Sequence, residues 1–188
     1  MDEVLLAPYD DAWPEHFRAE RRLLERVLPK DAVQTIEHAG STAVPGLEAK
    51  PIIDIFIAVP RVATARVTLV EPITSLGYVY WVENPDPDAM FFVKGMPPFG
   101  ERRTHHIHVM QPGTPRWQRV MLFRDYLRTH SAEAQNYLAL KRTLAARYST
   151  DREAYTKAKD NYIAGVVKAA RAERDKNTEP THEPKETP

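Results

Sequence analysis

The chain has no cysteine, which excludes disulfide bonds, a thiol nucleophile and zinc sites built on thiolates. Its 26 basic and 26 acidic side chains cancel, so it lacks the net positive charge typical of proteins that coat nucleic acids or bind membrane surfaces. No run reaches the roughly 18 apolar residues of a membrane helix, and the acidic start Met1-Asp2-Glu3 is unlike a secretory signal. We therefore expect a cytoplasmic protein that binds neither polynucleotide nor membrane, as a monomer or a homodimer.

The length of 188 residues suits one domain that buries its own apolar core. From Arg171 onward the sequence is charged, carries prolines and has no large apolar residue. Such a segment cannot bury enough surface to offset the entropy lost on ordering. We predict a folded domain over residues 1–172 and a disordered polar tail over 173–188.

The spacing of apolar residues predicts both helices and strands. Continuous or alternating apolar runs are typical of strands, and recurrence every three to four residues is typical of helices. The predicted helices cover about 12–28, 62–76 and 115–129, with two more after Ser131 and Thr150; the predicted strands cover 34–38, 52–59, 78–83, 90–94 and 103–110. This order predicts an α+β fold with a mixed sheet and a C-terminal helical bundle.

Asp54 stands in the middle of the apolar run Ile52–Val59. Strand alternation places it on the same face as Phe56, with the flanking isoleucines on the other face. An ionised carboxylate inside such a strand is costly unless it is paired, hydrogen-bonded or bound to a metal. Asp54 is therefore either a metal ligand or a buried acceptor for a neighbouring loop.

Gly40-Ser41-Thr42 follows the first predicted strand. Glycine allows backbone N–H groups to converge on an anion, and two adjacent hydroxyls add donors. The segment has no Walker A pattern, so an ordinary turn with a helix cap explains it as well as a phosphate-binding loop does.

Histidines recur in the last predicted strand, where His106 and His108 share one face and Ile107 points to the other. Two histidines at this spacing suit a metal site or a general base, and His38 is a further candidate partner. The alternative is a pair of polar strand residues at the rim of a cleft.

Three basic residues fall inside the apolar arcs of three successive predicted helices: Arg124, Lys141 and Lys159. A long basic side chain commonly lays its stem on apolar surface and keeps its charge in water. Three in a row also suit a shared anion site, because arginine and lysine bind phosphate.

With these residues assembled, the chain resembles the GrpB family of the nucleotidyltransferase superfamily. The resemblance covers roughly residues 5–170. The matching segments are 37–47 (EHAGSTAVPGL), 50–55 (KPIIDI), 104–109 (THHIHV) and 123–128 (FRDYLR), with the downstream Tyr137 and Lys141.

The resemblance implies a minimal nucleotidyltransferase fold, with helices packed on one side of a mixed sheet and a ligand cleft on the other. It implies that Gly40 and Ser41 hold a nucleotide triphosphate and that Asp54 is the first of the acids that bind divalent metal ions. The sequence departs from that pattern, because Phe56 stands where the second acid is expected and histidines stand where a third is expected. Either Asp54, His106 and His108, with Glu37, hold one ion, or the site binds a phosphorylated ligand without metal chemistry. The ion would be Mg²⁺ or Mn²⁺, with Zn²⁺ a weaker candidate.

Two functions remain open on these grounds. One is metal-dependent transfer of a nucleotide to a small acceptor, with Lys50 and Arg124 as charge clamps and His106 or His108 as base or auxiliary ligand. The other is a non-catalytic module that binds a nucleotide or a coenzyme A precursor on the same fold. A metallohydrolase built on the strand histidines is a third, weaker candidate.

Overall fold

The computed structural model describes residues 4–178 and contains one five-stranded sheet. The strand order is β1-β2-β5-β4-β3, in which β2 and β5 are parallel and the other neighbours are antiparallel. The strands are β1 (Thr35–Ala39), β2 (Ile53–Ala58), β3 (Tyr78–Tyr80), β4 (Ala89–Lys94) and β5 (His105–Met110). The α+β class and the mixed sheet predicted from the sequence are confirmed.

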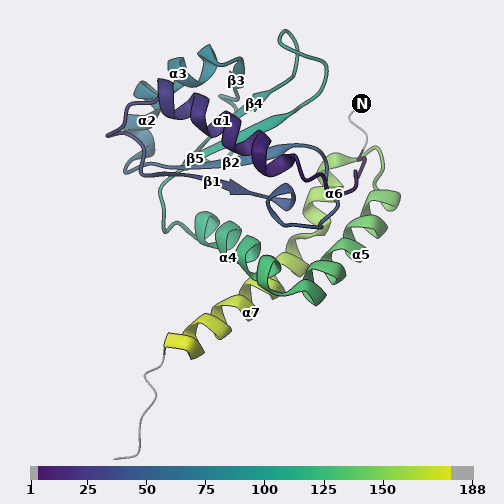
Figure 1. Cartoon of the computed structure of the whole chain (residues 1–188). Helices are drawn as coiled ribbons and strands as arrows, with labels where there is room; N and C mark the ends of the chain where they lie inside the picture. Colours follow the sequence, from purple (N-terminus) through teal and green to yellow (C-terminus); the bar gives the residue numbers. More distant parts are fainter. Residues whose placement is uncertain (1–3, 179–188) are drawn as a thin grey trace, which may run out of the picture.

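One face of this sheet is covered by three helices near the N-terminal half of the chain (Figure 1). The helices are α1 (Trp13–Val27), α2 (Val62–Thr68) and α3 (Val70–Ser75). Ile55, Ile57 and Ile107 point to this face and are fully buried against them. Removing this apolar surface from water is the main source of stability for the domain.

The opposite face is only partly covered, by the C-terminal helices. These are α4 (Pro115–Thr129), α5 (Ser131–Arg147), α6 (Arg152–Ala158) and α7 (Asp160–Thr178). Trp117 of α4 packs edge-on against Phe56 of β2, with ring centroids 6.4 Å apart. The prediction that helices pack on one side of the sheet is therefore corrected, because Phe56 and its apolar neighbours on this face also need cover.

Two predicted helices are each divided in the structure. The helix expected over 62–76 breaks at Leu69, since Pro72 has no N–H to donate to the carbonyl of Thr68. The last helix breaks at Lys159 and resumes as α7, which continues through 173–178 because Glu173, Arg174 and Lys176 are good helix formers. Residues 173–178 were predicted to be disordered; residues 179–188 lie outside the described part of the chain.

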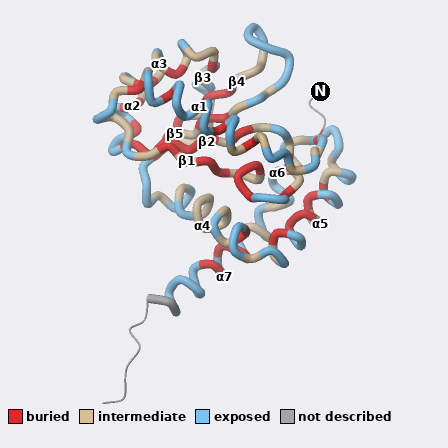
Figure 2. The backbone as a smooth tube through the Cα atoms, viewed as in Figure 1, coloured by how far each residue is buried: buried red, intermediate tan, exposed pale blue. Residues whose placement is uncertain are grey.

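The buried residues concentrate in and around the sheet, whereas residues 171–176 of α7 are exposed (Figure 2). Within residues 4–178, no helix combines the length and the apolar composition that crossing a membrane would require.

Candidate functional site

A cavity of about 280 Å³ opens on the second face of the sheet, between the end of β1, the start of β2 and the helices α5 and α6. Its volume lies just below the roughly 300–1,000 Å³ that is typical of small-ligand sites. Polar and charged side chains from several separate segments converge on it. The described residues that line it are Leu6, Ser41, Thr42, Ala49, Lys50, Ile52, Asp54, His106, Lys141, Arg152, Tyr155, Thr156 and Lys159.

Gly40 forms the turn that brings the end of β1 against Asp54. Its φ of 70° and ψ of −172° lie in a region that is essentially restricted to glycine. A Cβ at this position would lie 2.2 Å from Oδ2 of Asp54. Glycine is therefore required here twice, by its backbone conformation and by the close approach of the carboxylate.

The turn is held by hydrogen bonds that use Thr42 and His38. The Thr42 hydroxyl donates to the carbonyl of Ile52 at 3.2 Å and contacts Nε2 of His38 at 3.1 Å. The Thr42 hydroxyl therefore donates its one proton to another group of the protein. His38 stacks on Phe17 of α1, and burial lowers its pKa to about 4. It lies on the opposite sheet face from Asp54, so it does not join the other histidines.

Asp54 and His106 form the polar centre of the cavity. They occupy paired positions on β2 and β5, and Nδ1 of His106 lies 3.1 Å from Oδ1 of Asp54. Burial opposes ionisation of Asp54, but this hydrogen bond and the nearby histidines outweigh it, so the pKa of Asp54 lies below its usual value. Nε2 of His106 is buried and has no hydrogen-bond partner among the described residues. In a neutral ring whose Nδ1 donates to Asp54, this nitrogen would carry the lone pair.

His108 lies next along the same face, between two aromatic rings. Its ring centroid is 4.5 Å from that of Phe56 and 4.8 Å from that of Phe91. Burial lowers the pKa of His108 to about 3, so the ring is neutral. Nη2 of Arg116 donates to Nδ1 of His108 at 3.3 Å, which places the ring proton on Nε2 while that bond is made.

The three side chains fit one metal ion better than two. Asp54, His106 and His108 each offer a ligand atom, and these atoms lie within 4.8 Å of one another. Ligands of a single transition metal lie about 2.0–2.2 Å from the ion, so a small side-chain adjustment would bring the set together. One carboxylate and two imidazoles suit Mn²⁺ or Zn²⁺, whereas Phe56 gives a pair of Mg²⁺ ions no second carboxylate.

Two lysines approach the same tyrosine on the helical side of the cavity. Nζ of Lys159 lies 4.1 Å and Nζ of Lys50 4.8 Å from the ring centroid of Tyr155, which is 1% exposed. Burial, helped by neighbouring cations, lowers the pKa of Lys50 to about 8. Burial also lowers the pKa of Lys159 to about 8, although Asp54 opposes that shift. Both cations are thus poorly neutralised by the protein itself.

Lys141 and Arg152 complete the cationic wall. Lys141 is 1% exposed; its ammonium donates to the carbonyl of Glu48 and lies 5.1 Å from the ring centroid of Tyr137. Burial lowers the pKa of Lys141 to about 7. Four cationic side chains therefore line a cavity in which Asp54 is the one carboxylate among the described lining residues.

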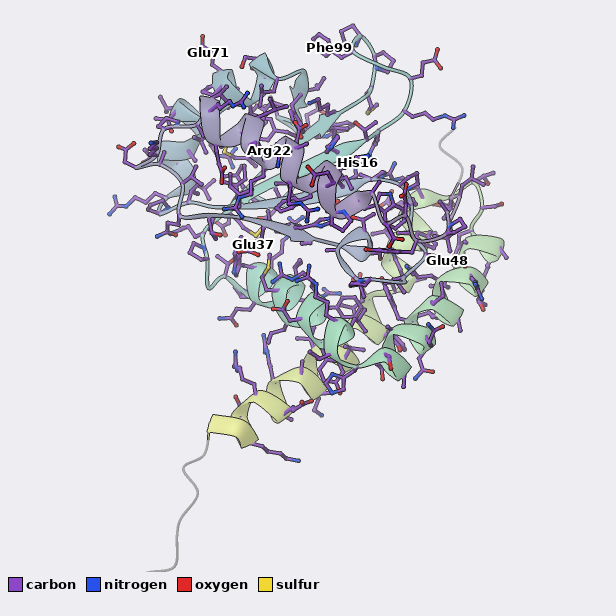
Figure 3. All side chains as sticks on the ribbon, viewed as in Figure 1. His16, Arg22, Glu37, Glu48, Glu71 and Phe99 are labelled. Atoms are coloured by element: carbon purple, nitrogen blue, oxygen red, sulfur yellow. The ribbon has the colours of Figure 1, made fainter. Side chains whose placement is uncertain are left out.

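Glu37 and Arg124 lie elsewhere. Nη1 of Arg124 donates to Oε2 of Glu37 and to the carbonyl of His38, both at 2.9 Å, and Nε of Arg124 donates to Asp125. Figure 3 shows Glu37 in the space between β1 and α4. This pair joins α4 to the end of β1, and neither residue is among those that line the cavity.

Most of the side chains proposed from the sequence do converge on one site. Asp54, His106, Ser41 and the lysines at 50, 141 and 159 line the cavity; Gly40 and His108 border it. Sequence reasoning missed Arg152 and Tyr155. The signal for Tyr155 was present, because it falls on the same helical arc as Lys159, but the arc alone does not show what that side of the helix contacts.

The fold and site together define a class: an α+β protein whose mixed sheet carries an Asp–His pair beside a cationic cavity. The sequence profile of the family described as GrpB protein matches residues 3–169, so the chain belongs to the GrpB family. It is 50% identical over 171 residues to the UPF0157 protein PA4798 of Pseudomonas aeruginosa, covering 91% of this chain and 69% of that protein.

Two further comparisons bear on fold and function. The crystal structure of the conserved protein GrpB from Enterococcus faecalis superposes with a TM-score of 0.79 at 32% identity, covering 90% of this chain and 99% of that one. A protein named dephospho-CoA kinase from Mycolicibacterium paratuberculosis is 30% identical over 188 aligned residues. The alignment covers 89% of this chain but only 46% of that protein.

Proposed function

We propose that the protein is a nucleotidyltransferase-superfamily member that binds a nucleotide or another phosphorylated small molecule in the cavity beside Asp54 and transfers a nucleotidyl group to a small acceptor. One observation carries this proposal: four cations and an Asp–His pair converge on a single cavity of about 280 Å³. Phosphate oxygens are the ligand atoms that such an arrangement neutralises best.

The residues have distinct roles in this proposal. Lys50, Lys141 and Lys159 hold the phosphates by charge, and Arg152 adds a bidentate donor. A divalent cation held by Asp54 and the histidines would neutralise charge at the reacting phosphate. The acceptor oxygen bonds to the α-phosphorus, and the bond from that phosphorus to pyrophosphate breaks. The acceptor proton is released either to Nε2 of His106 or, where that nitrogen is a cation ligand, to water.

The experiment is radiolabel transfer from α-labelled nucleoside triphosphates to a panel of small hydroxyl-bearing acceptors, with Mg²⁺, Mn²⁺ or Zn²⁺. The matched variant is Asp54→Asn, which keeps an oxygen acceptor for His106 and removes the charge. We expect transfer in the wild type and a loss of at least about 100-fold in Asp54→Asn. Transfer that is absent, or unchanged in the variant, would exclude the catalytic proposal.

A second function, binding without turnover, is favoured by Phe56. It supplies no ligand atom at the position where a second acid would be expected, and its ring is stacked on His108. The kinship with a protein named dephospho-CoA kinase makes coenzyme A precursors reasonable ligands for such a module. Thermal-shift measurements separate the two functions: stabilisation by an intact nucleotide or precursor without metal, and without consumption, supports binding alone.

A further inference from the structure

Among its described lining residues, the cavity has several charged side chains but no exposed aromatic ring on which a nucleobase could stack. Tyr155 is the one aromatic residue among its described lining residues, apart from the His106 imidazole, and it is 1% exposed beneath two ammonium groups. A ligand base therefore cannot lie on that ring. Proteins that read bases commonly use an exposed aromatic face for this purpose.

Among the described lining residues, the groups that could contact a base edge are mainly lysine, arginine and hydroxyl side chains, and a bound phosphate chain would engage these groups first. Among the described lining residues there is no Asn or Gln, whose amide groups make the paired hydrogen bonds of base recognition. The uncharged part of the wall is formed by aliphatic and hydroxyl side chains, including Leu6, Ala49 and Ile52. These side chains do not distinguish one base from another by hydrogen bonding.

The charges, by contrast, are arranged for several anionic groups. Lys50 lies in the segment before β2 and Arg152 is the first residue of α6, while Lys141 projects from α5 and Lys159 directly follows α6. Asp54 faces them from β2, and the Glu48 carbonyl accepts from Lys141 in the loop before β2. The four cationic side chains come from separate positions along the chain, and a chain of phosphates offers them more anionic oxygens than a single orthophosphate does.

We infer that this site recognises a chain of two or more phosphate groups and does not read a nucleobase, so inorganic tripolyphosphate and all four nucleoside triphosphates compete for it on nearly equal terms. The inference rests on the proposed function and specifies its ligand class. The cavity holds the phosphate chain, and the remainder of a nucleotide extends beyond it. Specificity for the rest of the reaction then comes from the acceptor.

The test is isothermal titration calorimetry of the full chain without divalent cations. The ligands are ATP, GTP, CTP, UTP, inorganic tripolyphosphate, pyrophosphate and orthophosphate. We expect dissociation constants within about threefold among the four nucleotides and within about tenfold between them and tripolyphosphate. Orthophosphate should bind at least about 100-fold more weakly, because it makes fewer charge-assisted hydrogen bonds and each of these strengthens binding by about tenfold or more.

The matched variants are Lys159→Met and Lys157→Met. Both lie at the end of α6, but Lys159 lines the cavity and Lys157 is exposed outside it. Lys159→Met should weaken tripolyphosphate binding about tenfold, and Lys157→Met should change it less than about twofold. An equal loss of affinity in both variants would overturn the inference, because it would show that binding depends on the net charge of the protein and not on the charge inside the cavity.

These titrations distinguish a failure of the inference from a failure of the proposed function. One nucleotide binding more than tenfold more tightly than the others, or than tripolyphosphate, overturns the inference and leaves the proposed function standing. Orthophosphate binding as tightly as tripolyphosphate overturns it too. If no nucleotide and no polyphosphate binds either in this titration or in a repeat with Mn²⁺, the proposed function itself is wrong.

Discussion

The two faces of the sheet are formed by the same strands but have different roles. On the face beneath α1, α2 and α3, residues such as Ile55 and Ile57 are fully buried in continuous apolar packing. On the opposite face, Phe56 packs against α4, while Asp54 and His106 at the neighbouring positions border a cavity. The face beneath α1, α2 and α3 provides most of the buried apolar surface. The opposite face has less apolar packing and carries the polar site. Because side chains alternate along β2, each of its residues contributes either to the apolar packing or to the face that carries the polar site.

The largest effect on stability is expected at the turn that supports Asp54. Gly40→Ala places a methyl group 2.2 Å from the carboxylate in a backbone conformation that alanine rarely adopts. Strain and overpacking together should cost about 2–6 kcal/mol in urea unfolding.

The control for that variant is Gly113→Ala. Gly113 also has a positive φ, of 82°, but a Cβ there meets no atom within 4 Å. It should cost only about 1–2 kcal/mol, the backbone strain alone. Equal losses of stability in the two variants would show that the close approach of Asp54 contributes nothing.

The next largest effect separates the two faces directly. Ile57→Ala removes a fully buried side chain from the α1 face and should lower the free energy of unfolding by about 2–5 kcal/mol. Because Ile57 points away from the cavity, tripolyphosphate affinity should change less than about twofold in the folded variant. A selective loss of affinity, with stability intact, would contradict the division between the faces.

A smaller, pH-dependent effect is expected at Lys141. Its pKa in the folded chain is about 7, below the usual value for lysine, so between pH 7 and about pH 10 the unfolded chain binds a proton that the folded chain has lost. Stability of the wild type therefore rises with pH through that window, and the cost of the buried charge is fully present below pH 7.

Lys141→Met removes this cost. The variant should be more stable than the wild type at pH 7, by on the order of 1 kcal/mol, with the advantage shrinking toward pH 10. Thermal unfolding across this range measures the difference, with Lys157→Met as the exposed control. Parallel curves for Lys141→Met and the wild type would show that Lys141 is not held as a costly buried charge.

Local patterns in the sequence predicted the strand that carries Asp54 and the shared face of His106 and His108, because alternation along a strand fixes which side each residue takes. They also placed Lys141 and Lys159 within the apolar arcs of their helices. They did not show what those arcs contact: Arg124 was proposed as a phosphate clamp, but it binds Glu37 and the end of β1.

The remaining differences arise from packing between distant segments. Strand pairing puts His38 on the face opposite Asp54, which the sequence around His38 does not reveal. Arg152 reaches the cavity because the chain turns between α5 and α6 and brings α6 to the same cavity that Ser41 lines. Such long-range contacts depend on how helices pack together, and helix periodicity alone does not determine that packing.

We propose that Asp54 and the cationic wall together form one site for a phosphorylated ligand with a divalent cation. The most direct measurement is calorimetric titration of tripolyphosphate into the wild type and Asp54→Asn, each with Mn²⁺ and with EDTA. We predict that Mn²⁺ strengthens binding to the wild type by at least about tenfold and that this gain is lost in Asp54→Asn, with thermal unfolding used to verify that the variant is folded at the temperature of the titration. An equal effect of Mn²⁺ on both proteins, or no binding to the wild type, would contradict the account.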